Sequence, residues 1–426
     1  MYIDSASKAQ LQQWESELSA EFQGFKNQSL NLDLTRGKPS AEQLSLTDNM
    51  DGILSGNYKC QDGSDARNYG GLFGIPEMRK LGAELLGVKE NEVIAGGNSS
   101  LTFMHLCFVF ACLYGPGGKG TQWHRERIPR FLCPVPGYDR HFSICEDLDV
   151  KMINVPMTAN GPDMDEVESL VKKDPSIKGM WCVPKYSNPT GIVYSDETVE
   201  RIAKLGRIAG PDFRVFWDNA YAVHDLTDNP PKLANIMDLC KKHGTDNLVY
   251  QFSSTSKISF AGAGVSFLAT STANLAGFEK HLFVLTIGPD KVNQLRHAKL
   301  FPDLAAVRKH MRKHAELLRP KFEAVLDHLR KNFTDSDLGT WSEPQGGYFI
   351  SFNARPGLAS EVIRLAGEAG VKLTPAGSTF PYKKDPENRN IRLAPSFPKV
   401  AELNKTMAVF VNCVKLAAVR QQLGNP

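Results

Sequence analysis

The sequence predicts an α/β protein: a large domain with a mainly parallel sheet of seven strands, followed by a smaller α/β domain. Two patterns predict this class. From about residue 90 to residue 270, short apolar runs alternate with helical stretches, as in a parallel sheet covered by helices on both faces. After residue 270, a long helical stretch comes before a second, shorter alternation of strands and helices. A length of 426 residues also exceeds that of one ordinary domain.

The elements follow in chain order. Residues 5–27 place apolar side chains at helical spacing behind Ser5, a candidate N-cap, and predict an amphipathic N-terminal arm. Seven apolar runs predict the strands of the large sheet, at 92–96, 131–135, 150–155, 179–184, 214–218, 247–252 and 265–270. Residues 286–299 are polar and non-periodic, and we expect a loop that crosses to a second subunit.

The last third of the chain predicts one long helix at 303–333, whose Arg, Lys and His residues we interpret as a solvated face. Strands are expected at 348–352, 371–376 and 390–395, and helices at 359–369 and 399–422. These elements divide the chain into three parts. Residues 1–60 form the arm and part of the small domain, 61–310 the large domain, and 311–426 the small domain, which starts inside the long helix.

Composition excludes several classes of protein. Hydrophobic residues make up 42% and charged residues 23%, which is typical of a globular protein in water. A net charge of +3 offers no basic surface for nucleic acid, and no run of 18 apolar residues predicts a membrane span. The eight cysteines are scattered without a CxxC pair. We expect buried thiols in a reducing cytoplasm and no metal site.

Chemistry-bearing residues follow the predicted strands, where a parallel sheet gathers its ligand groups. Gly97, Asn98 and Ser99 lie in a glycine-rich turn before an apolar helix, so that backbone N–H groups and the helix N-terminus can hold a phosphate. Tyr138 follows the second strand and can stack on a flat ring. Asn188 follows the fourth strand and offers an amide.

The most informative stretch is SSTSKISFAGAGVSF at 253–267, directly after a strand. Its amine, Lys257, can hold a carbonyl compound as a Schiff base, while the Ser254 and Ser256 hydroxyls bind an anion. The glycines after the lysine let the backbone approach that anion closely. An exposed lysine in a polar loop is the alternative interpretation, and the residues upstream decide against it.

Taken in order, NPTG at 188–191, Asp218 with Tyr221, and Ser254-x-x-Lys257 resemble the class I aminotransferases of fold type I, which depend on pyridoxal 5′-phosphate (PLP). The resemblance runs from about residue 30 to the C-terminus. TRGKP, PGYDRH, GPDKVNQLRH and IRLAPSFP are similar to the aspartate aminotransferases of type Ic. The fold that this implies is the fold type I transferase fold, with its large sheet domain and small α/β domain.

The resemblance also implies roles for individual residues. Lys257 forms the internal aldimine and moves the substrate proton, and Asp218 keeps the pyridine nitrogen protonated. The other implied contacts are to the ring, the phosphate and the substrate. By this resemblance, Tyr138 stacks on the ring and His141 supports Asp218. Asn188 and Tyr221 donate hydrogen bonds to the 3′-oxygen. Gly97, Asn98, Ser99 and Ser254 hold the phosphate, the neighbouring subunit's Tyr69 reaches it, and Gly37, Asn188 and Arg392 bind the substrate α-carboxylate.

One position departs from the family pattern. Gly264 lies where the family places an arginine that pairs with the cofactor phosphate. Since a phosphate carries close to two negative charges, we expect a cation from elsewhere, and Arg67 is our hypothesis. It lies two residues before Tyr69, so an extended segment puts both side chains on one face.

The function implied is amino transfer between L-aspartate and 2-oxoglutarate in a cytoplasmic homodimer with shared active sites. A second cationic patch for the distal carboxylate has candidates in Lys38, Asn98, Lys185 and residues 293–296. Two alternatives stay open: transamination of an aromatic or aminoadipate-like substrate, and a PLP-dependent elimination. A non-catalytic PLP sensor is disfavoured, because only about 30 residues precede the match.

Overall fold

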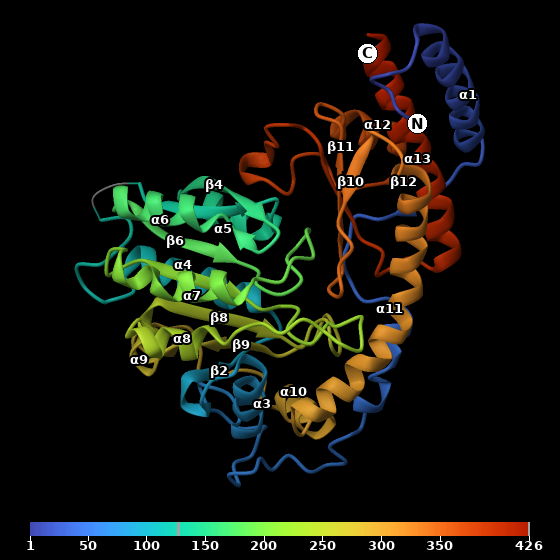
Figure 1. Ribbon diagram of the computed structural model, residues 1–426. Helices are drawn as coiled ribbons and strands as arrows, with labels where there is room; N and C mark the ends of the chain where they lie inside the picture. The colour runs from blue at the N-terminus through green and yellow to red at the C-terminus, as the bar shows by residue number, and fades with distance from the viewer. Residues whose placement is uncertain (126–127, 425–426) are drawn as a thin grey trace.

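A computed structural model describes residues 1–125 and 128–424, so two residues of the expected large domain (126–127) and two of the small domain (425–426) lie outside it. Figure 1 shows a large sheet covered by helices beside a smaller α/β part. Helix α11 (Leu304–Phe333) runs along both parts. The boundary that we expected at residues 310 and 311 falls inside this helix and stays a prediction.

The large sheet has eight strands in the order β2-β9-β8-β7-β6-β3-β4-β5. All seven predicted strands are confirmed, and the two-residue strand β5 is added at one edge. Their bounds are β2 Val93–Ala95, β3 Arg130–Val135, β4 Lys151–Thr158, β5 Gly161–Pro162, β6 Ile177–Cys182, β7 Arg214–Asp218, β8 Val249–Ser254 and β9 Ser266–Ala269.

Strands β4, β3, β6, β7 and β8 pair in parallel, whereas β9 is antiparallel to both β8 and β2. The stretch between β8 and β9 is too short for a helical crossover, so β9 must return antiparallel. This short return contains Lys257. The topology therefore holds the lysine at the carboxyl end of β8, beside the end of β7.

Side chains alternate between the two faces of the central strands, as a strand period of two requires. On β7, Phe216 packs into an aromatic cluster with Phe108 and Trp181, while Val215 and Trp217 pack into a second cluster on the other face. The helices that cover the sheet are α3 (Pro76–Leu86), α4 (Ser100–Leu113), α5 (Asp139–Asp147), α6 (Met164–Lys173), α7 (Asp196–Lys204), α8 (Ile236–His243) and α9 (Thr272–Leu285). Residues on opposite faces of one strand thus meet different surroundings.

The smaller part joins segments from both ends of the chain. It holds the antiparallel sheet β10 (Gly339–Trp341), β11 (Ile350–Ala354) and β13 (Asn390–Leu393), together with β1 (Leu32–Asp33) paired to β12 (Val371–Lys372). The expected strand at 371–376 keeps only its first two residues. Helix α1 (Lys8–Lys26) packs on α13 (Val400–Leu423), beside α12 (Ala359–Glu368). The arm is therefore part of the small domain's fold.

Three expectations are corrected. The N-cap of α1 is Ser7 and not Ser5, because Ser7 and Gln10 form a reciprocal capping box. Residues 286–299 are largely helical, in α10 (Lys291–Leu300), which begins at an Asp290 cap. The solvated face assigned to α11 is wrong for His310, His314 and Lys321, which are buried. The remaining short helix, α2 (Ala41–Ser45), packs against α11.

Candidate active site

The carboxyl end of β7 carries a buried carboxylate with one oxygen left free. Asp218 Oδ2 lies 3.0 Å from His141 Nε2, which comes from α5, as the sequence predicts. The His141 ring stacks on Trp181 with the centroids 4.2 Å apart. Asp218 Oδ1 is buried and has no hydrogen-bond partner among the described residues. An unpaired buried carboxylate oxygen is costly, so this atom is available to a donor from a ligand.

Lys257 lies beside this carboxylate, in the turn that follows β8. Its Nζ is 4.9 Å from the centroid of the Tyr221 ring. Desolvation lowers the pKa of Lys257, and the charge of Asp218 partly opposes that effect. A lower pKa makes more of the neutral amine available near neutral pH, and the neutral amine is the nucleophile.

Two tyrosines flank the lysine and the aspartate. Tyr138 begins α5, and its ring meets His141 edge to face with the centroids 4.9 Å apart. Tyr221 is buried. Burial is the largest cause that raises the pKa of both phenols, and nearby negative charges add to it. They therefore stay protonated and can donate hydrogen bonds at neutral pH.

The predicted carboxylate-binding residues come together from three distant segments. Arg392 Nη1, on β13, lies 3.1 Å from Asp139 Oδ1 and 3.4 Å from Asn188 Oδ1. The guanidinium lies over the Phe349 ring, 4.9 Å from its centroid. A Cβ on Gly37 would lie 2.2 Å from Phe349 Cζ, so the Gly37 backbone packs on the same ring. Arg392 Nε has no partner in the described part of the chain and can still donate.

The predicted phosphate turn lies at the N-terminus of α4, where Ser99 is the N-cap residue. Gly97 and Asn98 are exposed, and no atom lies within 4 Å of the place that a Cβ on Gly97 would take. Ser256 Oγ donates to Asn98 O over 2.7 Å and ties this turn to the lysine loop. Ser254, at the end of β8, is partly buried. The turn thus presents open backbone at a helix N-terminus, which suits an anion.

Gly264 has a packing reason for being glycine. A Cβ at this position would lie 2.7 Å from Ser256 Oγ and 2.8 Å from Ser256 N. The Asn293 side chain holds the same stretch by donating to Ala263 O and Gly264 O. An arginine does not fit here unless the loop moves, so the family's phosphate anchor is excluded by the close approach of two backbone segments.

Tyr69 and Arg67 do not reach the site of their own chain. The Tyr69 side chain is exposed (84%), and its carbonyl accepts a hydrogen bond from Lys291 Nζ. Arg67 forms an ion pair with Asp65 over 2.6 Å and lies over the Tyr58 ring. Their action on the neighbouring subunit's phosphate stays a prediction, and Arg67 would have to exchange Asp65 for the phosphate.

Of the candidates for the distal carboxylate, Lys185 turns elsewhere. Its Nζ pairs with Asp225 over 2.7 Å and donates to Ala222 O. Lys38 lies over the Phe397 ring, 4.0 Å from its centroid, and Arg296 is exposed. Lys38, Arg296 and Asn98 therefore remain as candidates for that role.

A cluster that the sequence analysis missed supports the lysine loop from behind. His224 Nε2 and the Tyr348 hydroxyl both donate to Lys257 O over 3.3 Å. His310 Nε2 lies 2.8 Å from Ile258 O and 3.0 Å from His314 Nε2. Gln43 Nε2 contacts both the Tyr348 hydroxyl and His314 Nδ1. We call these five side chains (Gln43, His224, His310, His314 and Tyr348) the histidine cluster.

The histidines of this cluster are held neutral. Desolvation is the largest cause that lowers the pKa of His224, His310 and His314, and it lowers that of His314 to about 3. In the sequence, the only indication of this cluster is that His310 and His314 are four residues apart, which places them one turn apart on a helix. Helical periodicity alone could not distinguish a buried pair from the charged face around it.

Other features of the described residues bear on the class of protein. They contain no cluster of His, Cys, Asp and Glu that could hold a metal ion. None of their helices is both long and apolar enough to cross a membrane. All eight cysteines are free thiols, and all are buried.

The fold and the site together define an aminotransferase of fold type I. The family model described as aspartate amino-transferase matches residues 6–425, and the chain belongs to this family. Enzymes of this family and fold depend on PLP.

Relatives extend over nearly the whole chain. An aspartate aminotransferase from Corynebacterium glutamicum is 48% identical over 403 residues, which cover 94% of this chain and 93% of the relative. A crystal structure of an aspartate transaminase from the same organism superposes with a TM-score of 0.96 at 46% identity, covering 99% of both chains. An α-aminoadipate aminotransferase from Thermus thermophilus, at 19% identity and a TM-score of 0.75, covers 92% of this chain and 93% of its own. At that identity it shares the fold alone.

Proposed function

We propose that this enzyme binds pyridoxal 5′-phosphate and transfers the amino group of L-aspartate to 2-oxoglutarate. One observation carries the proposal: a buried carboxylate with a free oxygen, Asp218 Oδ1, lies beside a lysine whose pKa is lowered by burial. The free oxygen fits a protonated ring nitrogen, the amine fits a carbonyl carbon, and the open turn at Gly97 fits a phosphate. The assignment to aspartate rests on the relative from Corynebacterium glutamicum.

In this proposal each residue has a chemical task. When bound, the cofactor would supply an aldehyde carbon that takes up the amino group and an electron-withdrawing ring that delocalises the electron pair left at the substrate Cα. Lys257 attaches the cofactor and then takes the Cα proton as general base. Asp218, oriented by His141, holds a proton on the ring nitrogen. Tyr221 and Asn188 would donate to the 3′-oxygen of the cofactor, and Tyr138 would cover one face of its ring.

The substrate is oriented by a residue of the small domain. Arg392 binds the α-carboxylate with two parallel hydrogen bonds, which a planar guanidinium makes well. Its Nη1 must then release Asp139 and Asn188, to which its present bonds are long. Because Arg392 lies on β13 and Lys257 on the large sheet, bound substrate joins the two domains, whose boundaries we place at residues 60 and 310.

We further propose a homodimer whose active sites are shared through Tyr69. Exposed apolar side chains gather at the end of α9 and just beyond it, which supports an interface there: Phe283 (75% exposed), Val284 (81%), Leu285 (58%) and Ile287 (61%). Light scattering measures the mass in solution. Val284→Asp is expected to shift that mass from dimer to monomer, and a wild-type monomer would contradict the proposal. The eight buried thiols favour a cytoplasmic location.

An amino-donor panel tests the substrate. The purified holoenzyme is supplied with 2-oxoglutarate and with aspartate, phenylalanine, 2-aminoadipate or leucine in turn, and glutamate formation is measured. The expected result is a kcat/KM for aspartate at least about tenfold above that of the other donors, a difference of about 1.4 kcal/mol. Leucine and phenylalanine lack the distal carboxylate, and 2-aminoadipate places it two methylenes farther from Cα. Equal rates with an aromatic or aminoadipate donor would refute the aspartate assignment. Ammonia release without a 2-oxo acid acceptor would indicate an elimination.

A further inference from the structure

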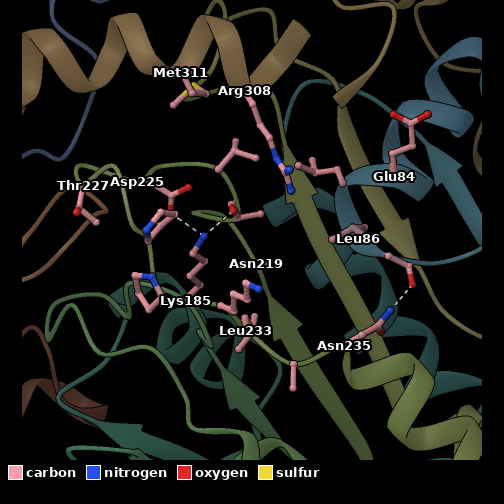
Figure 2. Close-up of a pocket in the computed structure, with 18 of the residues that line it drawn as sticks. Glu84, Leu86, Lys185, Asn219, Asp225, Thr227, Leu233, Asn235, Arg308 and Met311 are labelled. Atoms are coloured by element: carbon pink, nitrogen blue, oxygen red, sulfur yellow. Dashed lines mark hydrogen bonds and ion pairs between the residues drawn. The ribbon is translucent and has the colours of Figure 1, made fainter. Parts of the chain in front are cut away.

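A cavity separate from the candidate active site opens on the face of the large sheet that lies opposite the Asp218 side chain. It has a volume of about 990 Å³ and lies between the ends of β7 and β8, the segment 222–236, the end of α3 and the first half of α11. Figure 2 shows Lys185 and Asn219 on one side of this space and Arg308 extending toward it from α11. Of the residues considered for the cofactor or the substrate, Lys185 lines it, and Lys185 is the candidate whose side chain turns away from the active site.

The floor of this cavity carries two unpaired polar groups. Gln251 is 2% exposed and Asn219 is 8% exposed. Gln251 Nε2 and Asn219 Oδ1 have no hydrogen-bond partner within the residues that the structure describes. Buried amide atoms are almost always paired, so these two need a partner from outside the chain. One is a donor and the other an acceptor, so the floor can bind a group that both accepts and donates.

The roof of the cavity carries cations without a counter-ion. Arg308 and Arg312 are exposed residues one turn apart on α11 that line the cavity and make no ion pair with any described residue. The lining has five basic and three acidic side chains, and two of the three acidic side chains are paired with a lysine or an arginine. Asp225 pairs with Lys185, Asp228 pairs with Arg319, and Glu84 accepts from the backbone N–H of Leu304. The charge left over is positive, which favours an anion.

We propose that this cavity is a second ligand site, for a small carboxylate-bearing metabolite with a hydroxyl or amino group. Its carboxylate binds Arg308 and Arg312 at the roof. Its polar end accepts a hydrogen bond from Gln251 Nε2 and donates one to Asn219 Oδ1 at the floor. A simple anion would satisfy the arginines and leave the two amides unpaired, so the site selects a ligand that has both groups.

The cavity is connected to the active site through shared segments. Asn219 is the residue directly after β7, which ends at Asp218. Neighbouring residues of an extended chain point to opposite faces, so Asn219 lines the cavity and Asp218 faces the cofactor side. Lys185 lines the cavity, donates to Ala222 O next to Tyr221, and lies three residues before Asn188. The lining therefore adjoins the segments that carry three predicted site residues, Asp218, Asn188 and Tyr221. The site is suited to regulate turnover.

Citrate, which has carboxylates and a hydroxyl, is the probe. Calorimetric titration of the holoenzyme saturated with a non-reactive dicarboxylate, so that the substrate site is filled, is expected to show one saturable citrate site. Arg308→Ala is expected to weaken binding by about tenfold or more, because it removes a charge-assisted contact. Gln251→Leu is expected to weaken it by several-fold. Lys309→Ala removes the same charge from an exposed neighbour that does not line the cavity, and should leave binding unchanged.

Three results would overturn the proposal. The first is no saturable citrate binding to the wild-type holoenzyme. The second is binding that Arg308→Ala and Lys309→Ala weaken equally, which would indicate general attraction to the helix. The third is inorganic phosphate binding as tightly as citrate and with no dependence on Gln251, since the floor amides would then recognise nothing. Unchanged melting temperatures of the variants show that a loss of binding is not a loss of fold.

Discussion

The two sides of the Lys257 loop are both rich in polar groups, and they differ in whether those groups are paired. On the cofactor side, Asp218 Oδ1 and Arg392 Nε are buried without a partner among the residues that the structure describes. In the histidine cluster behind the loop, Gln43 contacts Tyr348 and His314, Tyr348 donates to Lys257 O, and His314 contacts His310, which lies against Ile258 O. Within the described chain, His224 Nδ1 is the one buried side-chain atom of the cluster without a partner. Both sides are buried and polar, so the distinguishing feature of a ligand site is unpaired buried atoms that gather beside reactive groups or line a cavity. By that criterion the cavity above Asn219 and Gln251 belongs with the cofactor side.

The strongest test of the cofactor side is the lysine itself. Lys257→Ala is expected to abolish the visible absorbance of the attached cofactor and to lower transamination by about 10²–10⁴-fold, because both the attachment and the general base are lost. Lys257→Arg keeps the charge and is expected to fail equally. Borohydride reduction of the wild-type holoenzyme should label the peptide that contains Lys257. Label on a peptide that contains another lysine would contradict the assignment of Lys257 as the residue that attaches the cofactor.

Asp218→Asn tests the unpaired carboxylate oxygen. The amide keeps the shape and removes the charge that holds a proton on the ring nitrogen. Loss of a charged hydrogen bond of about 1.5–3 kcal/mol predicts roughly a 10–100-fold fall in kcat. The free energy of unfolding should change little, because Oδ1 has no partner within the described chain. Near-native turnover with bound cofactor would refute the role.

His314→Leu tests the other side, where we expect the opposite pattern. Removing the ring breaks the contacts to Gln43 and His310 and should lower the free energy of unfolding by about 1–3 kcal/mol. The value of kcat should stay within a few-fold of wild type. Lys313→Ala, at the exposed neighbouring position, is the control and should change neither quantity. A large loss of kcat with an unchanged melting temperature would make the histidine cluster catalytic.

The same cluster predicts a stability that depends on pH. In the unfolded chain a histidine binds a proton below its ordinary pKa of 6.5, whereas His314 in the folded chain does so only near 3. Between these values the unfolded state holds the extra proton, so lowering the pH destabilises the fold by about 1.4 kcal/mol per pH unit for each such histidine. Chemical denaturation at pH 7.5, 6.0 and 5.0 should show this fall, with a smaller slope in His314→Leu.

The smallest expected effect is at Gly264, on the cofactor side. In Gly264→Ala the new Cβ meets Ser256 Oγ and N, which disturbs the Ser256 bond to Asn98 O. Loss of a hydrogen bond of about 0.5–1.5 kcal/mol predicts a roughly 2–10-fold weaker binding of the cofactor. Gly262→Ala is a matched control, since nothing lies within 4 Å of its Cβ position. Equal affinities in the two variants would show that the close contact is unimportant.

Local patterns in the sequence determined where the strands of the large sheet lie and which reactive residues follow them. Strand and helix periods are properties of neighbouring residues, and ligand groups follow strand ends in a parallel sheet. That is why seven strands of the large sheet, the position of Lys257 after β8, and the contact of His141 with Asp218 were predictable from the residues and from the family that they resemble. The helix at Lys291–Leu300 was missed because its short polar run lacks an apolar stripe.

Only the tertiary structure decided which polar groups find partners. Gln43 meets His314 and Tyr348 across 271 and 305 residues, and Arg392 meets Asp139 across 253. Gly264 must be glycine because the chain returns against Ser256. Asn219 Oδ1 and Gln251 Nε2 have no partner in the described part of the chain, because a cavity lies between them and α11. Such contacts depend on how distant segments pack, and no local period encodes them. The sequence by itself determined where the chemistry begins, and packing determined which atoms remain free to perform it.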